Sequence, residues 1–356
     1  MQILSFKSKI LVHSEIELQL LSVIDELKPG KIFLLTDNNT YSFCLPHFEN
    51  LMQREKVAVL EIGQGESQKV ISTVIEIWNF LQDHGADRES LLVNLGGGML
   101  LDIGGFAAST FKRGMKFVNI PTTLLSMVDA SVGGKTGINL NDYKNHIGTF
   151  SQPEYVLISP VFLRTLSIRQ IYAGWAEMLK HGVIRSETHL QKILDADPGD
   201  IDEVALTGLI SESVQIKNYF VQEDPYEKNL RKVLNFGHTI GHAFESLAFS
   251  LENPLLHGEA VANGLICELF LSAKFYDPQE HIIREVTDYI GSKYRPIKLS
   301  EKDFDKVYKY LLQDKKNTGN KINFTLIRQI GEPLTNQYIS REHIEEALKF
   351  YINKIA

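Results

Sequence analysis

Short apolar runs recur through the first 160 residues and alternate with longer segments of helical periodicity. The runs are continuous rather than alternating, which is typical of strands buried on both faces of a parallel sheet. The helical segments between them are long enough to be crossover connections. This pattern predicts an α/β domain with a parallel, Rossmann-like sheet. The expected strands are 31–35, 57–62, 91–95, 116–120 and 154–158.

Two helix boundaries can be predicted in this half of the chain. Residues 14–27 have helical periodicity, and Ser14 is expected to cap them because its hydroxyl can accept from a free backbone amide. A second helix, which follows the strand at 57–62, is expected to end at Gly85.

From about Pro160 the periodicity becomes helical and strand patterns are few. Residues 281–290 and 341–354 both have the pattern of amphipathic helices. A chain of 356 residues suggests about two domains at roughly 150 residues each. We therefore expect an α/β domain at 1–160 and an all-α domain at 161–356.

Composition and charge narrow the function classes. The chain is 44% hydrophobic and 23% charged, which is ordinary for a globular protein. A formal net charge of −7 with no basic tract argues against a nucleic-acid partner. Cys44 and Cys267 lie too far apart in sequence to suggest a disulfide framework. With no signal-peptide pattern and no membrane-spanning run, a cytoplasmic protein is expected.

Histidines gather between residues 231 and 259. His238 and His242 are four residues apart, so a helix would place both imidazoles on one face, and His257 follows. Neutral imidazoles grouped in this way suit a divalent transition metal. A helix that carries two unrelated histidines is the simpler alternative. The presence of Arg231 and Asn235 in the same short segment favours a site.

A glycine triplet, Gly96-Gly97-Gly98, separates the strand at 91–95 from a helix. Backbone amides at such a turn can bind a phosphate, helped by the helix N-terminus. The spacing differs from G-x-G-x-x-G, so a dinucleotide would be held in a variant way. Gly104 and Gly105 then cost the helix about 1 kcal/mol each, which predicts a compensating close approach.

Further polar residues follow the next strand. Thr122 and Thr123 can reach a ribose or pyrophosphate, or can cap the following helix. The segment Gly133-Gly134-Lys135-Thr136 is not a Walker A loop, because Asp129 occupies the position that needs glycine. Lys135 still suits an anion, and Lys144-Asn145 is expected on a polar loop.

Glu177 and Lys180 are three residues apart and therefore share a helix face. A surface salt bridge is the simpler interpretation. The apolar neighbours Trp175, Met178 and Leu179 favour a partly buried face instead.

Together these motifs resemble 3-dehydroquinate synthase, and the match runs through nearly the whole chain. The resemblance implies a nucleotide-binding α/β domain, a helical domain, an active site in the cleft between them and a homodimer. It also implies NAD and a divalent metal, zinc or cobalt. The motifs that carry it are Gly65-Glu66 with Lys69, the triple glycine with Asp102, 112–114, 121–125, 129–136, 144–145, 175–177 with Lys180, 231–242 and 257–259.

The resemblance also implies residue roles. Glu177, His238 and His257 resemble the metal ligands. His242 resembles a residue that supports the ligands without binding the metal, or one that transfers a proton. The residues that resemble NAD contacts are Asp37, Glu66, Lys69, Gly97, Gly98, Asp102, Thr122, Thr123 and Thr165, together with Lys135 and Lys144. The residues that resemble the substrate-binding and catalytic set are Asp129, Lys135, Lys144, Asn145, Lys180, Lys217, Arg231, Asn235 and Lys316, with Arg113 reaching into the neighbouring subunit.

The implied reaction converts an anionic sugar phosphate, 3-deoxy-D-arabino-heptulosonate 7-phosphate, to 3-dehydroquinate and phosphate. A cationic cluster in an acidic protein suits a substrate with a carboxylate and a phosphate. Leu101 departs from the family pattern, in which glycine is common; a bulky side chain there could shift the helix start against the pyrophosphate, and we expect it to be tolerated.

Three alternatives remain. A valiolone-type cyclase would act on a sedoheptulose phosphate that lacks the carboxylate. An iron-type polyol dehydrogenase would release NADH. A catalytically dead regulator would bind NAD and metal without turning over any substrate.

Overall fold

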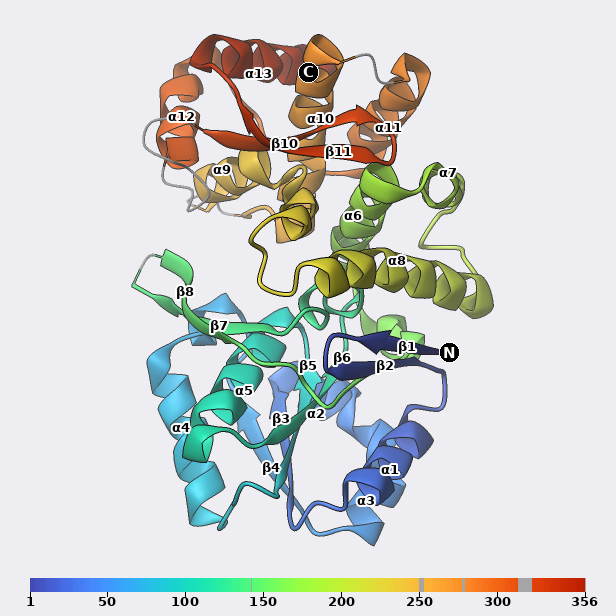
Figure 1. Ribbon diagram of the computed structural model, residues 1–356, viewed down its shortest axis with the longest axis vertical. Coiled ribbons are helices and arrows are strands. Elements are labelled where there is room, and N and C mark those ends of the chain that lie inside the picture. Colours follow the sequence, from blue (N-terminus) through green and yellow to red (C-terminus); the bar gives the residue numbers. More distant parts are fainter. Residues whose placement is uncertain (142, 250–252, 277–278, 313–321, 356) are drawn as a thin grey trace. The chain divides into compact units, whose positions relative to one another are not determined.

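The computed structural model describes residues 1–141, 143–249, 253–276, 279–312 and 322–355 (Figure 1). The chain forms two compact units, of which unit 1 contains residues 1–167 and 202–226 and unit 2 contains residues 168–201 and 227–356. Residues 202–226 therefore pack with the N-terminal part of the chain. The functional division at residues 160 and 161 stays a prediction. Among the described residues, no helix is both long enough and apolar enough to cross a membrane.

Unit 1 is built on a seven-stranded sheet in the order β1-β2-β9-β6-β5-β3-β4. All neighbours are parallel except β1 and β2, so the sheet is mixed rather than purely parallel. The five predicted strands are confirmed, and the β1–β2 hairpin at the edge was missed. The strands are β1 Gln2–Ser5, β2 Ser8–Val12, β3 Ile32–Asp37, β4 Val57–Ile62, β5 Leu91–Gly96, β6 Lys116–Pro121 and β9 Tyr155–Ile158.

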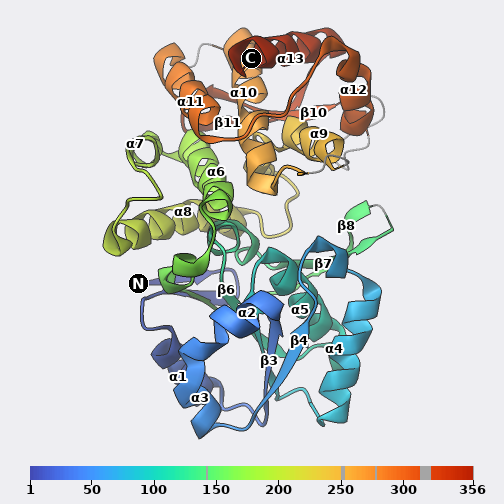
Figure 2. The ribbon, with the colours of Figure 1, turned by 180° about the vertical axis from the view of Figure 1, so that it is seen from behind.

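Helices pack against this sheet as the alternating pattern predicts. α4 and α5 share one hydrophobic core with sheet residues such as Phe33, Leu35 and Leu92. α1 and α3 lie side by side (Figures 1 and 2), and Glu17 of α1 accepts from the Leu51 amide of α3 at 2.9 Å. The helices are α1 Ile16–Leu27, α2 Asn38–Phe43, α3 Glu49–Arg54, α4 Ile71–Asp83, α5 Gly98–Thr110 and α8 Glu203–Glu223, with short helices η1 Leu45–Phe48, η2 Glu66–Gln68, η3 Phe111–Arg113, η4 Ser126–Ala130 and η5 Pro160–Thr165.

Of the two predicted helix boundaries, one is confirmed and one is wrong. Gly85 follows α4 with φ +68°, and its amide donates to Gln82 at 2.9 Å. Ser14 does not cap α1, because the N-cap is Glu15 and no side chain bonds to the free amides. The Ser14 backbone carbonyl instead accepts from the Ile16 amide at 3.0 Å.

The glycine pair inside α5 has a packing reason. A Cβ on Gly104 would lie 2.1 Å from Oδ1 of Asn94, and one on Gly105 would lie 2.6 Å from Cγ2 of Thr136. The predicted close approach is therefore confirmed, and it is to neighbouring strands. Leu101 is 2% exposed and belongs to the same hydrophobic core.

A second, antiparallel hairpin lies against α5. It is formed by β7 Lys135–Leu140 and β8 Tyr143–Phe150. The prediction of a loop at Lys144-Asn145 is wrong, since both residues are in β8. The side chains of β8 are nearly all exposed, so the strand has no buried apolar stripe.

Unit 2 is mainly helical and is organised around α10, which is buried along most of its length. Helices α6, α9, α11 and α13 all contact it. The predicted helices at 281–290 and 341–354 are confirmed. The unit is not all-α, because an antiparallel hairpin turns at Gly331. Its elements are α6 Ile168–Arg185, α7 Glu187–Asp195, η6 Leu230–Asn235, α9 His238–Ala248, α10 His257–Phe275, α11 Glu280–Lys293, η7 Glu301–Asp303, α12 Phe304–Leu312, β10 Asn323–Gln329, β11 Glu332–Tyr338 and α13 Arg341–Ile355.

Candidate active site

The three histidines found by spacing come together in unit 2. His238 and His242 lie one turn apart on α9, with ring centroids 5.3 Å apart. His257 begins α10, and its ring centroid is 5.3 Å from that of His238 and 5.8 Å from that of His242. One ligand nitrogen from each ring lies within 4.8 Å of the other two. The predicted cluster is thus present in the fold.

A fully buried carboxylate faces two of these rings. Glu177 Oε1 lies 3.4 Å from Nε2 of His238 and 3.8 Å from Nε2 of His257. Within the described residues this oxygen accepts no hydrogen bond, whereas Oε2 accepts from Lys180 Nζ. A buried carboxylate oxygen that accepts no hydrogen bond is unfavourable, so the arrangement suits a cation at Oε1.

The separations of these atoms suit one metal ion. Two ligands at about 2.0–2.1 Å from a tetrahedral zinc lie roughly 3.3 Å apart. The 3.4 Å and 3.8 Å separations at Glu177 are close to this value. One carboxylate and two imidazoles also leave room for a substrate oxygen, as a catalytic site needs. His242 would be the third imidazole of an alternative ligand set.

In His238 and His257, the hydrogen-bond partner of Nδ1 decides which ring nitrogen is left to bind a metal. His238 Nδ1 lies 3.2 Å from the carbonyl oxygen of Phe236, which only accepts, so in the neutral ring Nδ1 carries the proton and Nε2 the lone pair. His257 Nδ1 lies 3.4 Å from Oε2 of Glu245, with the same consequence. Glu245 was not predicted from the sequence. It lies three residues after His242 on the same helix, and that spacing was the available signal.

Arg231 and Asn235 precede the histidines on η6, a 3₁₀ helix rather than an α-helix. Arg231 is only 2% exposed, which is unusual for a cation. Asn235 Nδ2 donates to Oε1 of Glu227 at 3.2 Å. Glu227 was missed by the sequence analysis, and its φ of +55° marks an unusual backbone position. Lys316 lies outside the described residues.

The N-terminus of α5 fits the predicted phosphate site in unit 1. Gly97 is its N-cap, Gly98 is its first residue, and no side chain caps the helix. Its free amides can therefore bind an anion. The amide of Thr122 donates to the carbonyl of Gly96 at 3.0 Å, which joins the ends of β5 and β6. Thr123 Oγ1 accepts from the Ser126 amide at 3.1 Å, at the residue where η4 begins.

Lys69 connects residues predicted to contact NAD with a residue predicted to contact substrate. Its side chain is 4% exposed, and Nζ donates to Asp102 Oδ2 and to Asn145 Oδ1, both at 2.5 Å. Burial raises the pKa of Asp102, and the nearby Lys69 cation opposes that change. Asn139, which was not predicted, donates to Glu66 at 2.8 Å and accepts from the Asn145 amide at 2.8 Å.

A second buried lysine pairs with Asp129. Lys217 on α8 is 5% exposed, and its Nζ donates to Oδ1 of Asp129 at 2.5 Å and to the Asp129 carbonyl. Both residues lie in unit 1, although Lys217 was expected to belong to the second domain. Lys135 at the start of β7 and Lys144 on β8 have exposed side chains.

The remaining predicted residues lie at separate places in unit 1. Asp37 ends β3 and caps α2, accepting from the Thr40 amide at 2.9 Å. Arg113 is exposed at the end of η3 with φ +66°. Thr165 is exposed at the end of η5, where its hydroxyl donates to Phe162 at 3.3 Å.

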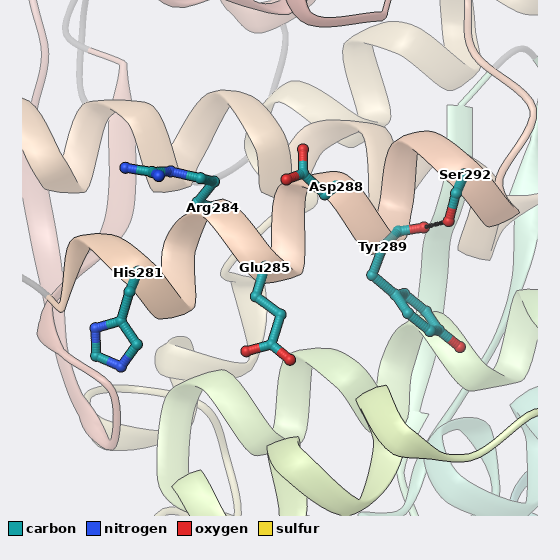
Figure 3. A pocket seen from close by; sticks show the side chains of 6 residues that line it. All are labelled: His281, Arg284, Glu285, Asp288, Tyr289 and Ser292. Atoms are coloured by element: carbon teal, nitrogen blue, oxygen red, sulfur yellow. Dashed lines mark hydrogen bonds between the residues drawn. The ribbon is translucent and has the colours of Figure 1, made fainter.

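A hollow of about 630 Å³ lies along α11 and contains no predicted site residue. Figure 3 shows that its lining is the polar face of this amphipathic helix. Arg284 pairs with Glu280 on the same helix at 3.2 Å. The lining residues are His281, Arg284, Glu285, Asp288, Tyr289 and Ser292.

Comparison with known proteins places these observations in a family context. Residues 59–173 match the family described as 3-dehydroquinate synthase N-terminal, and residues 174–317 match 3-dehydroquinate synthase C-terminal. The chain is 44% identical to the 3-dehydroquinate synthase of Parabacteroides distasonis, over 97% of this chain and 98% of that protein.

Two solved structures are similar over nearly the whole chain. A 2-epi-5-epi-valiolone synthase from Streptomyces hygroscopicus, with NAD⁺ and Zn²⁺ bound, has a TM-score of 0.84 at 25% identity and covers 99% of this chain and 98% of that one. A 2-deoxy-scyllo-inosose synthase in complex with carbaglucose-6-phosphate, NAD⁺ and Co²⁺ has a TM-score of 0.83 at 23% identity and covers 98% of this chain and 99% of that one.

Proposed function

This chain belongs to the 3-dehydroquinate synthase family and has that family's enzyme activity in the shikimate pathway, and we propose that it works with bound NAD and a divalent metal held by Glu177, His238 and His257. The reaction converts 3-deoxy-D-arabino-heptulosonate 7-phosphate to 3-dehydroquinate and phosphate. The observation that carries the metal proposal is the buried Glu177 Oε1, which faces the Nε2 atoms of both histidines.

The residues present fit the metal. Imidazole and carboxylate ligands suit Zn²⁺ and Co²⁺, the ions in the two similar structures. Lys180 bonds to the other oxygen of Glu177 and so leaves Oε1 for the ion. We assign His242 to proton transfer rather than to the ligand set, because Glu177 supplies the negative charge that a dication needs.

The residues of unit 1 fit NAD. The uncapped N-terminus of α5 offers amides to a pyrophosphate. Both similar structures hold NAD⁺. The proposed NAD contacts are Asp37, Glu66, Lys69, Gly97, Gly98, Asp102, Thr122, Thr123, Lys135, Lys144 and Thr165. When bound, NAD and the metal supply the oxidation of a substrate hydroxyl to a ketone and the return of the hydride.

The chain's own residues then bind and orient an anionic substrate. The substrate carries a carboxylate and a phosphate, and cationic side chains suit both. The imidazole of His242 can exchange a proton with the substrate next to the metal position. Phosphate departure, ring opening and the intramolecular aldol step need mainly a held geometry. The proposed binding set is Asp129, Lys135, Lys144, Asn145, Lys180, Lys217, Arg231, Asn235 and Lys316.

The oligomeric state and the cellular location are proposed as well. The exposed Arg113, in an unusual backbone conformation, is proposed to serve the site of a second subunit in a homodimer. A cytoplasmic location stays a prediction.

The activity is tested by incubating the protein with the heptulosonate phosphate, NAD⁺ and Zn²⁺. Inorganic phosphate should be released without net accumulation of NADH. Sustained NADH formation would indicate a polyol dehydrogenase, and phosphate release from sedoheptulose 7-phosphate alone would indicate a valiolone-type cyclase. Binding of NAD and metal without any turnover would indicate a catalytically dead regulator.

A further inference from the structure

Arg169 joins the helix of one proposed metal ligand to the helix of another. It lies in the first turn of α6, the helix of Glu177. Its Nε donates to Oε1 of Glu259 at 2.7 Å and its NH2 group donates to Oε2 at 2.7 Å. Glu259 lies in the first turn of α10, two residues after His257, and its side chain is 5% exposed. A two-point contact of this kind fixes orientation as well as distance.

The same two side chains hold the chain on both sides of His257. Glu259 Oε2 also accepts from the amide of Leu256 at 2.8 Å, which closes the first turn of α10 around His257. Arg169 Nη2 donates to the carbonyl of Pro254 at 2.8 Å, and Nη1 donates to Oδ1 of Asn253 at 2.9 Å. The approach to His257 and the turn after it are therefore both bonded to α6.

Between the Arg169–Glu259 contact, here called the fork, and the metal position, the backbones of α6 and α10 touch. A Cβ on Gly258 would lie 1.9 Å from the carbonyl oxygen of Ala173 and 2.5 Å from its Cα. No side chain fits in that space. Only glycine at position 258 permits this separation of α6 and α10.

These contacts recur once per helical turn. Arg169, Ala173 and Glu177 are spaced four residues apart and so lie on one face of α6. They meet Glu259, Gly258 and His257 in that order, the last at 3.8 Å between Glu177 Oε1 and His257 Nε2. The fork is thus in register with the proposed ligand pair, two turns away.

We propose that Arg169 and Glu259 are positioning residues that set the separation of Glu177 and His257 and thereby the metal affinity of the site. This inference rests on the proposed metal centre. Metal–ligand distances are tolerated within about 0.2 Å, so a small shift of α10 along α6 weakens binding. Groups that orient ligands from outside typically change metal affinity by about 10–100-fold when they are removed.

The test compares Co²⁺ affinity and the Co²⁺ absorption spectrum in Arg169→Ala, Arg169→Lys and Glu259→Gln. Arg169→Ala should weaken Co²⁺ binding at least about 10-fold and change the spectrum, because the ligand geometry relaxes. Arg169→Lys should recover only part of the affinity, since a lysine cannot form the two-point contact. The matched control is Arg341→Ala, which removes an arginine that forms ion pairs elsewhere in unit 2, with Asp305 and Glu345. It should change Co²⁺ affinity less than about 2-fold.

A metal-free melting curve of each variant separates this effect from a general loss of stability. Equal Co²⁺ affinity and an unchanged spectrum in Arg169→Ala would overturn the positioning role. So would an equal loss in Arg341→Ala at the same change in Tm. His257→Ala distinguishes the two proposals: if it binds Co²⁺ as tightly as the natural chain, the metal centre itself is wrong. Impaired binding in His257→Ala together with normal binding in Arg169→Ala would contradict only the role of the fork.

Discussion

Glu177 Oε1 and His238 Nε2 face each other at 3.4 Å in the interior of unit 2. In the neutral imidazole of His238 the proton lies on the nitrogen that faces the Phe236 carbonyl, so both facing atoms carry lone pairs. Two acceptors at this distance repel unless a cation or a proton lies between them. This relationship is the reason for assigning a metal to the pair.

Glu245 should contribute to metal affinity although it is not a proposed ligand. Its carboxylate lies 3.4 Å from Nδ1 of His257 and directs the other nitrogen toward Glu177. Glu245→Gln should weaken zinc binding about 10-fold, because an amide oxygen is a weaker acceptor than a carboxylate. Competition with a chromogenic chelator measures the change. Glu346→Gln on α13 is the control, and identical affinities in Glu245→Gln and the natural chain would contradict the role.

Two glycines inside helices should respond in opposite ways to alanine. In Gly104→Ala the new Cβ meets Asn94, which is buried and donates to Asn119 at 2.9 Å, so the free energy of unfolding should fall by about 1–3 kcal/mol. Gly208 lies in α8 with nothing within 4 Å of a Cβ, and Gly208→Ala should raise stability by up to about 1 kcal/mol. Urea unfolding measures both, and equal shifts of the same sign would contradict this account.

Lys69 should be needed for both stability and NAD binding. Lys69→Met leaves the carboxylate of Asp102 without its cation in a largely buried place, which should cost about 2 kcal/mol or more. Asp102→Asn in the Lys69→Met background should restore part of that loss, because the unpaired charge is removed. Tm values of the single and double variants check this, with NAD affinity from calorimetry. Additive losses would show that the two groups are not coupled.

The buried thiol of Cys44 should lower the free energy of unfolding at alkaline pH. Burial raises the pKa of its thiol to about 12, whereas the thiol of the unfolded chain titrates near 9. Above pH 9 the unfolded chain releases this proton and the folded chain keeps it, so stability falls as pH rises toward 12. The stability advantage over Cys44→Ala should shrink by about 2 kcal/mol between pH 8 and pH 10.5, as measured by urea unfolding. A constant difference would contradict the burial effect.

The strands of unit 1 could be predicted because burial on both faces gives continuous apolar runs. β5, which is buried from Leu91 to Gly96, covers the expected strand at 91–95. β8 could not be predicted in the same way, since its side chains are exposed and its sequence has no continuous apolar run. The hairpin that turns at Gly331 had a glycine signal that was not used.

The candidate site was only partly accessible from local sequence. The spacing of His238 and His242 predicted their shared face, and the resemblance supplied Glu177. The packing of α8 with unit 1 depends on contacts such as Lys217 with Asp129, which are distant in sequence. The pairing of Arg169 with Glu259 likewise depends on how α6 crosses α10, and no local pattern encodes it.

The zinc content of ligand variants tests the central claim most directly. Glu177→Ala, His238→Ala, His242→Ala and His257→Ala can each be loaded with Zn²⁺, dialysed and measured for bound metal per chain, beside His343→Ala as a control. We predict that Glu177→Ala, His238→Ala and His257→Ala lose the metal, and that His242→Ala and His343→Ala keep one equivalent while His242→Ala loses activity. Loss of zinc from His242→Ala with full retention in Glu177→Ala would contradict the assigned centre.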